Sequence, residues 1–561
     1  MTALDALQTY FGYEQFRPLQ DEIVESVLAG KDTLALLPTG GGKSICFQVP
    51  TLVQEEGLCL VVTPLIALMK DQVENLRRRD IRAAAIYTGM SYDQQQTAID
   101  NCMFGPYRFL YVSPERLESE EFRHKLAALP IVLIAVDEAH CISQWGYDFR
   151  PSYLRISEIR ALLPQQVPVL ALTATATPEV AEDIQRQLMF RAPNVIRQSF
   201  ARENLSYLVR YCKNSQDTHS AGRTKTEELQ HIVSRMARSR IIVYVRNRKR
   251  AEELANLLGC PFYHAGLSPE ERTRRQEAWD GIMVCTNAFG MGIDKPDVRV
   301  VIHYDLPDSP ETYFQEAGRA GRDGKDAYAV LLYAPEDKGK VQKRVADNYP
   351  PRAFVEDVYH KMADFLCVGA GSGLGHSFAL HIDELCHTMR LPVLQTYSAL
   401  HLLSQAGYID FQEEQDNQAR VMVNVSLHAL RDYQLSAEQE ELLHSILRKY
   451  PGVMTELKYL HGEITDRIHE TLSSLAARHI ITYIPRTRAC RVTFVQERQT
   501  EVYLPRRIYE EREDLFEKRL HTMLEYAEQT SCCRSQLLLS YFGETDAPCC
   551  GTCDVCRSKK G

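Results

Sequence analysis

The stretch Thr33-Leu-Ala-Leu-Leu-Pro-Thr-Gly-Gly-Gly-Lys-Ser44 joins an apolar run to a glycine-rich turn. The apolar run predicts a buried strand, and the glycines let backbone N–H groups surround a phosphate where the next helix begins. Lys43 would contact the β- and γ-phosphates, and Ser44 would hold Mg²⁺. A complete phosphate-loop pattern has glycine where Leu37 stands, so an ordinary glycine-rich turn is the alternative. The predicted nucleotide-binding residues here are Thr39, Gly40, Gly41, Gly42, Lys43 and Ser44.

Similar apolar runs alternate with helical stretches as far as about residue 332. Runs without polar alternation, separated by helices, are typical of parallel sheets that are covered on both faces. The pattern begins again near Ile241, which predicts a second sheet. The runs are 58–62, 131–136, 169–172, 241–245 and 300–303.

Two carboxylates follow one of these runs directly, in Asp137-Glu-Ala-His140. The carboxyl ends of parallel strands form the edge where such folds bind ligands. Asp137 can coordinate Mg²⁺, and Glu138 can orient or deprotonate an attacking water. A surface acidic pair is the weaker alternative, because adjacent carboxylates after five apolar residues need a cation nearby.

The length of 561 residues predicts three or four domains. The 45% hydrophobic and 25% charged content excludes global disorder and collagen-like repeats. A net charge of −9 argues mildly against a protein that coats nucleic acid along its whole surface, although a local basic groove fits this average. With neither a signal peptide nor a run long enough to cross a bilayer, we expect a cytoplasmic protein without a membrane partner.

Beyond a glycine-rich linker at 369–375, the pattern changes to helix, helix and hairpin, and it does so twice. We interpret 382–425 and 441–495 as two winged-helix-like units. The first expected wing tip, 412–418, is acidic. The second, 485–491, is basic, and its Arg486 and Arg488 are expected to meet duplex DNA at a fork. Protein interaction or packing is the alternative role for both units.

The motifs, taken in order, resemble those of superfamily 2 helicases, and specifically the RecQ family of ATP-dependent DNA helicases. The resemblance covers residues 10–332 and rests on Phe16-Arg-Pro-Leu-Gln20, 37–44, 62–72, 112–116, Asp137-Glu-Ala-His140 with 141–146, 172–176, 263–267, 288–297 and Gln315-Glu-Ala-Gly-Arg319 with 320–324.

The resemblance implies a two-lobed motor with ATP and Mg²⁺ between the lobes. Phe16, Arg17 and Gln20 look like the motif that recognises adenine, and Gly292 and Asp294 would join the nucleotide site. The catalytic set would be Lys43, Asp137, Glu138, Gln315, Arg319 and Arg322, with the arginines reaching the γ-phosphate from the second lobe. Movement from 3′ to 5′ and a setting in DNA repair and recombination are implied in the same way.

The segment 143–153 resembles the aromatic-rich loop with which the family senses single-stranded DNA, and a buried aromatic corner is the alternative. Tyr147 stands where the family usually has histidine. The DNA contacts implied are Gln144, Trp145, Phe149 and Arg150 in this loop, with Thr63, Pro64, Ser113 and Arg116 at phosphates.

Six of the sixteen cysteines crowd the last 30 residues, which indicates a metal site in a reducing compartment. The match to the family's zinc module implies Cys533, Cys550, Cys553 and Cys556 as Zn²⁺ ligands, and Cys532 and Cys549 compete for these roles. An iron–sulfur cluster or a redox C-x-x-C pair are the alternatives. The family usually has this module directly after the second lobe; here about 170 residues intervene.

We therefore predict an α/β fold with two RecA-like parallel-sheet domains, followed by winged-helix-like units and a small helical Cys₄ zinc module. The predicted domains are 1–204, 205–336, 337–430, 431–500 and 501–561. The expected partners are single-stranded and forked DNA, with single-strand-binding or recombination proteins as candidates, and a monomer is expected. A DNA-dependent translocase with little strand separation and an adaptor with a dead motor are the competing functions.

Overall fold

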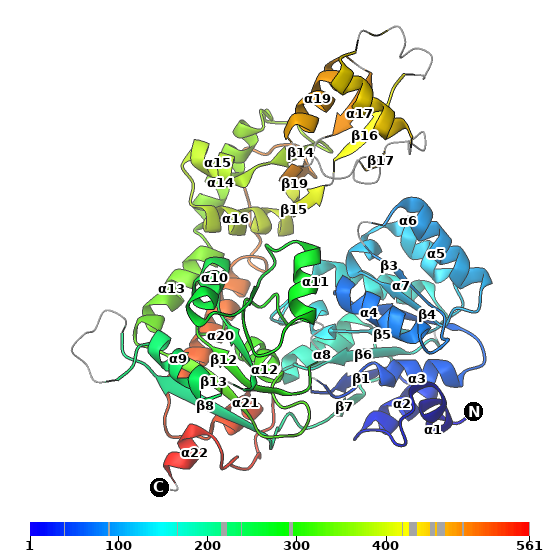
Figure 1. The fold of residues 1–561 in the computed structure, drawn as a ribbon. Helices are drawn as coiled ribbons and strands as arrows, with labels where there is room; N and C mark the ends of the chain where they lie inside the picture. The colour runs from blue at the N-terminus through cyan, green and yellow to red at the C-terminus, as the bar shows by residue number, and fades with distance from the viewer. Residues whose placement is uncertain are drawn as a thin grey trace. The chain divides into compact units, whose positions relative to one another are not determined.

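The computed structural model describes residues 1–559 except 39, 88–89, 165, 215–221, 237, 291–294, 418, 426–432, 434, 449–454, 457–465, 479 and 485–486 (Figure 1). It divides into two compact units. The first unit contains Met1–Val341 and Leu515–Gly561, and the second contains Gln342–Asp514. None of the described helices has the length and apolar character that a membrane crossing requires.

The first unit begins with a seven-stranded sheet in the order β3-β4-β2-β5-β6-β1-β7, with every pairing parallel. The strands are β1 Thr33–Leu36, β2 Leu58–Val62, β3 Ala83–Ile86, β4 Phe109–Val112, β5 Ile131–Val136, β6 Val169–Thr173 and β7 Val195–Arg197. The helices are α1 Ala3–Ala6, α2 Gln20–Leu28, α3 Ile45–Val53, α4 Ile66–Arg77, α5 Tyr92–Phe104, α6 Glu120–Ala127, α7 Ile156–Leu162 and α8 Pro178–Gln187.

The apolar runs form strands because both faces of this sheet are covered. All residues of β1, β2 and β4 are buried, as are those of β5 apart from Val132. The register pairs Val62 with Val136 and Leu36 with Thr173, so these neighbouring strands end level with one another. The phosphate loop after β1, Thr63 after β2 and Asp137 after β5 therefore leave the sheet at the same edge.

A second parallel sheet follows in the order β10-β11-β9-β12-β13-β8, as predicted. Its strands are β8 Leu205–Tyr211, β9 Arg240–Tyr244, β10 Phe262–Tyr263, β11 Ile282–Cys285, β12 Val298–His303 and β13 Ala327–Tyr333. The helices of this part are α9 Lys225–Arg235, α10 Arg248–Leu258, α11 Pro269–Glu277, α12 Pro310–Ala317 and α13 Glu336–Asn348. We call the two sheet domains lobe one and lobe two.

The end of the chain returns to the lobes. Helices α20 Glu510–Glu528, α21 Arg534–Tyr541 and α22 Asp554–Ser558 carry the terminal cysteines, and in Figure 1 they lie beside β8 and β13. Phe542 is fully buried, with its ring centroid 5.3 Å from that of Phe200 and 5.1 Å from that of Phe314. The Glu544 carboxylate accepts hydrogen bonds from the Phe200 N–H and the Ser199 hydroxyl, each at 2.7 Å. This terminal module therefore holds the segment that joins β7 to β8, and thus the two lobes.

The second unit contains α14 Arg352–Phe365, α15 Ile382–Met389 and α16 Val393–Gln405 around a sheet ordered β14-β19-β15. These strands are β14 Ser377–Leu380, β15 Ile409–Asn417 and β19 Thr487–Phe494. A smaller module lies between β15 and β19 in sequence. Its elements are β16 Arg420–Val423, α17 Ala437–Leu447, β17 Thr455–Glu456, α19 Asp466–Ala477 and β18 Ile481–Ile484.

The expected strand pairing in this unit is wrong. Strand β15 pairs with β19, and β16 pairs with β18, so each expected hairpin has exchanged a strand with the other. The segments 412–417 and 487–491 are paired strand residues and not hairpin tips, with Asp416 opposite Arg488. The smaller module has its own core, which includes Val421, Leu443 and Leu472. It is an insertion between the two wing strands, β15 and β19, of the second unit. The domain boundaries 430/431 and 500/501 stay predictions.

The Phe542 contact predicts how strongly the terminal module stabilises the lobes. Phe542→Ala should lower the free energy of unfolding by about 3–5 kcal/mol, because it removes a buried ring and leaves a cavity. Urea denaturation followed by tryptophan fluorescence measures this. Phe104→Ala is the matched control, since Phe104 is 86% exposed, and it should change stability by less than about 0.5 kcal/mol. Equal urea midpoints for Phe542→Ala and Phe104→Ala would contradict the stabilising role assigned to Phe542.

Candidate functional site

The phosphate loop is shaped by glycines and supported by Gln20. Gly40 and Gly42 have φ values of +82° and +74°, in the left-handed region that favours glycine. A Cβ on Gly42 would lie 2.4 Å from the Gln20 side-chain nitrogen. This nitrogen donates to the carbonyls of Gly41 at 3.1 Å and Gly42 at 3.0 Å, and the Gln20 amide oxygen accepts from the Arg17 N–H at 2.9 Å. The buried Gln20 side chain thus braces the loop in this structure.

A cavity of about 560 Å³ lies over this edge of lobe one. It brings together predicted site residues from four segments: Arg17, Gly40, Gly42, Lys43, Ser44, Thr63, Asp137 and Glu138. Phe16 is half-buried and packs with a small apolar cluster instead. Phe11 and Tyr13 line the cavity, and Tyr13 is 49% exposed. Both rings could stack on a base. The aromatic stretch Tyr10-Phe-Gly-Tyr13 is the feature of the sequence from which they could have been predicted.

Asp137 and Glu138 form a half-buried acidic pair at the end of β5. Asp137 accepts hydrogen bonds from the Thr63 hydroxyl at 3.3 Å and from the Glu138 N–H at 3.0 Å. Burial, followed by repulsion from Glu138, raises the pKa of Asp137 to about 6. One Glu138 carboxylate oxygen is buried without a hydrogen-bond partner among the described residues. Because such a pair needs positive charge, these residues and Ser44 fit a divalent cation.

Lobe two places its two arginines differently. The Arg322 side chain reaches the phosphate loop, where its Cδ lies 3.6 Å from the ideal Cβ position of Gly40. A second cavity of about 230 Å³ is lined by Arg322 and Gly40, and also by Gly41 and Arg17. Arg319 is buried within lobe two and donates to the Gly290 carbonyl. The structure therefore brings Arg322 to the nucleotide loop and leaves Arg319 inside its own lobe.

Three expected nucleotide-site residues, Thr39, Gly292 and Asp294, lie outside the described residues.

The aromatic-rich loop connects the acidic pair with lobe two. Burial lowers the pKa of His140 to about 4, so the ring is neutral near pH 7. Its Nδ1 lies 2.9 Å from the Thr173 hydroxyl, and the ring stacks on Tyr147 with centroids 4.6 Å apart. The Tyr147 hydroxyl donates to the Gln315 side-chain oxygen at 3.1 Å. Tyr147, unusual at this position in the resembled family, thus makes the contact to α12 of lobe two.

The residues expected at DNA vary in exposure. Trp145 is 47% exposed. Thr63 and Ser113 are buried as whole residues, so neither faces a strand directly in this structure. Gln144, Phe149 and Pro64 are half-buried. Arg116 donates a hydrogen bond to Gln95, and Arg150 forms an ion pair with Asp148. Arg486 and the side chain of Arg488 lie outside the described part of the structure.

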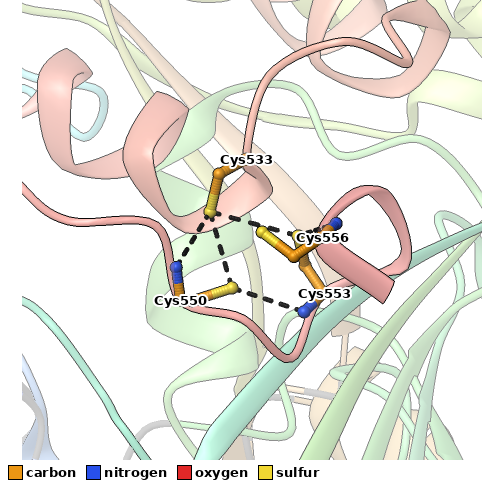
Figure 2. A group of neighbouring side chains, drawn as sticks. All are labelled: Cys533, Cys550, Cys553 and Cys556. Atoms are coloured by element: carbon orange, nitrogen blue, oxygen red, sulfur yellow. Dashed lines mark hydrogen bonds between the residues drawn. The ribbon is translucent and has the colours of Figure 1, made fainter. Parts of the chain in front are cut away.

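Four of the six terminal cysteines form one cluster. Figure 2 shows the sulfur atoms of Cys533, Cys550, Cys553 and Cys556 facing a common centre, and all four lie within 4.8 Å of one another. Cys533 Sγ is 3.5 Å from Cys550 Sγ and 4.0 Å from Cys553 Sγ. A tetrahedral ion with metal–sulfur bonds of about 2.3 Å places its sulfurs about 3.8 Å apart, so the cluster fits such a site.

The other two terminal cysteines lie outside this cluster. Cys532 and Cys549 are exposed, and the Cys549 thiol donates to the side-chain oxygen of Gln536. Although burial opposes it, N–H groups of Thr552 and Cys553 lower the pKa of the Cys550 thiol. A thiolate in this cluster is therefore favoured by its own backbone. The geometry brings four of the six terminal cysteines together and leaves Cys532 and Cys549 outside the cluster.

Family models match three parts of the chain. The DEAD/DEAH box helicase model matches residues 17–184, and the helicase conserved C-terminal domain model matches 224–324. The RecQ zinc-binding model matches 489–557. Together they cover both lobes and the cysteine cluster.

The chain is also similar to curated helicases. The ATP-dependent DNA helicase RecQ of Pasteurella multocida is 41% identical over 352 residues, which are 61% of this chain and 54% of the relative. The probable ATP-dependent DNA helicase RecS of Bacillus subtilis is 42% identical over 349 residues, 60% of this chain and 68% of the relative. The chain thus spans little more than half the length of the RecQ relative.

Solved structures share the fold. A DUF1998 helicase, MrfA bound to DNA, matches with a TM-score of 0.50 and 19% identity over 61% of this chain and 50% of that one. The DEAD-box helicase Mss116, bound to ssRNA and UDP-BeF, matches with a TM-score of 0.50 and 17% identity over 61% of this chain and 75% of that one. Two parallel-sheet lobes, a phosphate loop facing the Asp137 edge and a terminal Cys₄ cluster, with these sequence matches, place the chain in the RecQ family of superfamily 2 helicases.

Proposed function

We propose that this chain is an ATP- and Mg²⁺-dependent DNA helicase that moves 3′ to 5′ along single-stranded DNA and separates duplex at forks. The observation that carries the proposal is the cavity that unites Lys43, Ser44, Asp137 and Glu138 while Arg322 of lobe two touches the same phosphate loop. The polarity, and a role in DNA repair and recombination at a cytoplasmic, DNA-associated location, rest on family membership.

Each residue of the cavity has a chemical task in this proposal. Lys43 binds the terminal phosphates, and Glu138 orients the attacking water and accepts its proton. Mg²⁺, held by Ser44 and Asp137, would neutralise the phosphate oxygens and the acidic pair. Arg322 adds a planar positive charge where charge develops during phosphoryl transfer. Arg319 would have to leave the Gly290 carbonyl to do the same, which requires lobe two to move.

DNA would regulate this chemistry through the aromatic-rich loop. Trp145 is exposed for stacking on a base, and base–aromatic stacking has no strict sequence preference. Displacement of the loop would change the stack between Tyr147 and His140 and the hydrogen bond to Gln315. Both contacts adjoin the residues that activate water, so DNA binding and hydrolysis would be linked.

The motor proposal is tested on forked DNA with a 3′ tail, a 5′ tail or blunt ends. We expect unwinding of the 3′-tailed fork only, and loss of DNA-stimulated ATP hydrolysis by at least about 100-fold in Lys43→Ala and Glu138→Gln. Glu120→Gln, at a carboxylate that is 81% exposed, is the control and should behave as wild type.

Other outcomes separate the alternatives. DNA-stimulated hydrolysis without unwinding would favour a translocase that remodels nucleoprotein complexes. Full hydrolysis by either motor variant would refute the assigned chemistry. No hydrolysis in the wild-type chain would favour an adaptor with a dead motor.

We propose that the basic segment at Arg486 and Arg488 contacts duplex DNA near the fork. Arg486→Ala with Arg488→Ala should weaken duplex binding and reduce the salt slope of log K by about 2, because two phosphate contacts are lost. A salt titration of binding to blunt duplex measures the slope. Arg78→Ala with Arg155→Ala removes the same charge from exposed sites in lobe one and should leave the slope unchanged. An unchanged slope in the first variant would refute the contact.

We propose Zn²⁺ as the structural metal of the cysteine cluster, supported by its geometry and by the RecQ zinc-binding match. A closed Cys₄ site contributes to folding and takes no part in chemistry. Cys553→Ser should lose about one bound zinc per chain and lower the thermal midpoint, whereas Cys549→Ser should change neither. Metal analysis and thermal unfolding measure both properties. Visible absorbance from bound iron, or zinc loss only in Cys549→Ser, would contradict the assignment.

A further inference from the structure

One guanidinium joins three parts of the first unit. Arg519 of α20 is only 9% exposed, and it donates to the carbonyl of Trp145 and, at 3.3 Å, to that of Gly146. Its Nε lies 3.5 Å from a carboxylate oxygen of Glu311 in α12. The Tyr541 hydroxyl of α21 donates to the same oxygen at 2.8 Å. The terminal module, the aromatic-rich loop and lobe two therefore meet at Arg519.

The chemistry of this contact suits positioning. A guanidinium presents rigid, forked donors that can hold two successive carbonyls in a fixed geometry, whereas an ammonium group is a compact charge on a flexible stem. Glu311 is 3% exposed and supplies the negative charge that a buried arginine needs. The backbone at Trp145 is therefore held from behind while its indole stays 47% exposed. A cavity of about 570 Å³, lined in part by Trp145, Glu311, Lys518 and Arg519, leaves space beside the ring.

Helix α12 receives two links from the loop region. Glu311 faces Arg519, and Gln315 accepts from Tyr147. These residues are four positions apart and thus lie on one face of the helix. The same helix ends just before Arg319, so a shift of the loop against α12 would reach the segment that carries the lobe-two arginines.

We propose that Arg519 is a positioning residue that fixes the Trp145 loop against α12, so that the C-terminal module takes part in the stimulation of ATP hydrolysis by single-stranded DNA. The inference rests on the proposed function for its kinetic part. Its structural part, the placement of Trp145, holds without any activity. The zinc module then has a role in coupling besides its role in stability.

The test uses the full chain with Arg519→Gln, Arg519→Lys and Glu311→Gln. Arg519→Gln should lower the maximal DNA-stimulated hydrolysis rate about tenfold, because two carbonyls lose a charge-assisted partner, while hydrolysis without DNA stays within about twofold. Arg519→Lys should fall between Arg519→Gln and wild type. Glu311→Gln should reproduce the loss from the lobe-two side. Arg78→Gln removes the same charge from a side chain of lobe one that is 67% exposed and should stay close to wild type.

Acrylamide quenching of tryptophan fluorescence supplies the second readout. The chain has two tryptophans, and Trp279 is 2% exposed, so the quencher reports on Trp145. Arg519→Gln should change the quenching without DNA or nucleotide, and Arg78→Gln should not. Thermal midpoint and zinc content confirm that each variant is folded; if Arg519→Gln is not, Arg519→Lys and Glu311→Gln decide.

Wild-type stimulation and quenching in folded Arg519 variants, or an equal loss in Arg78→Gln, would overturn the inference. If the wild-type chain shows no DNA-stimulated hydrolysis, the proposed function fails, and the quenching comparison alone then decides whether Arg519 places the loop.

Discussion

The repulsion between two half-buried carboxylates, Asp137 and Glu138, is the constraint on which the site depends. The apolar strand β5 carries both groups to a sheet edge beside the cavity of about 560 Å³. Lys43, from the loop after β1, supplies a positive charge that acts on Asp137, and Arg322 of lobe two reaches the same loop at Gly40. Arg322 can act on a nucleotide in this loop only when the two lobes are close together. The proposed hydrolysis would therefore depend on the movement of one lobe against the other.

The chain beyond the lobes supports this arrangement from behind. Phe542 and Glu544 hold the segment between β7 and β8, and Arg519 holds the loop that follows the acidic pair. These contacts come from residues more than 300 positions away in sequence. The cysteine cluster joins the segments around the short helices α21 and α22, and the zinc ion proposed for it would add to the order of this module.

The two parallel sheets and the nucleotide cavity could be predicted from sequence because buried parallel strands are continuous apolar runs and phosphate chemistry needs glycine, lysine and carboxylates at fixed places. The predicted strand pairing in the second unit was wrong because β15 and β19, which pair in the structure, are about 70 residues apart and no turn between them marks the contact. Arg519 could not be predicted, since an arginine on an amphipathic helix usually faces solvent. Phe11 and Tyr13 were not predicted because the neighbouring motif, Phe16 to Gln20, already contains an aromatic residue at the position where the family recognises adenine.

The insertion in the second unit has an evolutionary consequence. Its module starts at β16 and finishes at β18, two strands that pair with each other, so the chain leaves and rejoins β15 and β19 through adjacent positions. A module attached in this way can be lengthened, exchanged or lost without changing the distance that its host must span. The wing is therefore a position at which evolution can insert or replace a module, and with it a binding surface, while the two lobes stay unchanged.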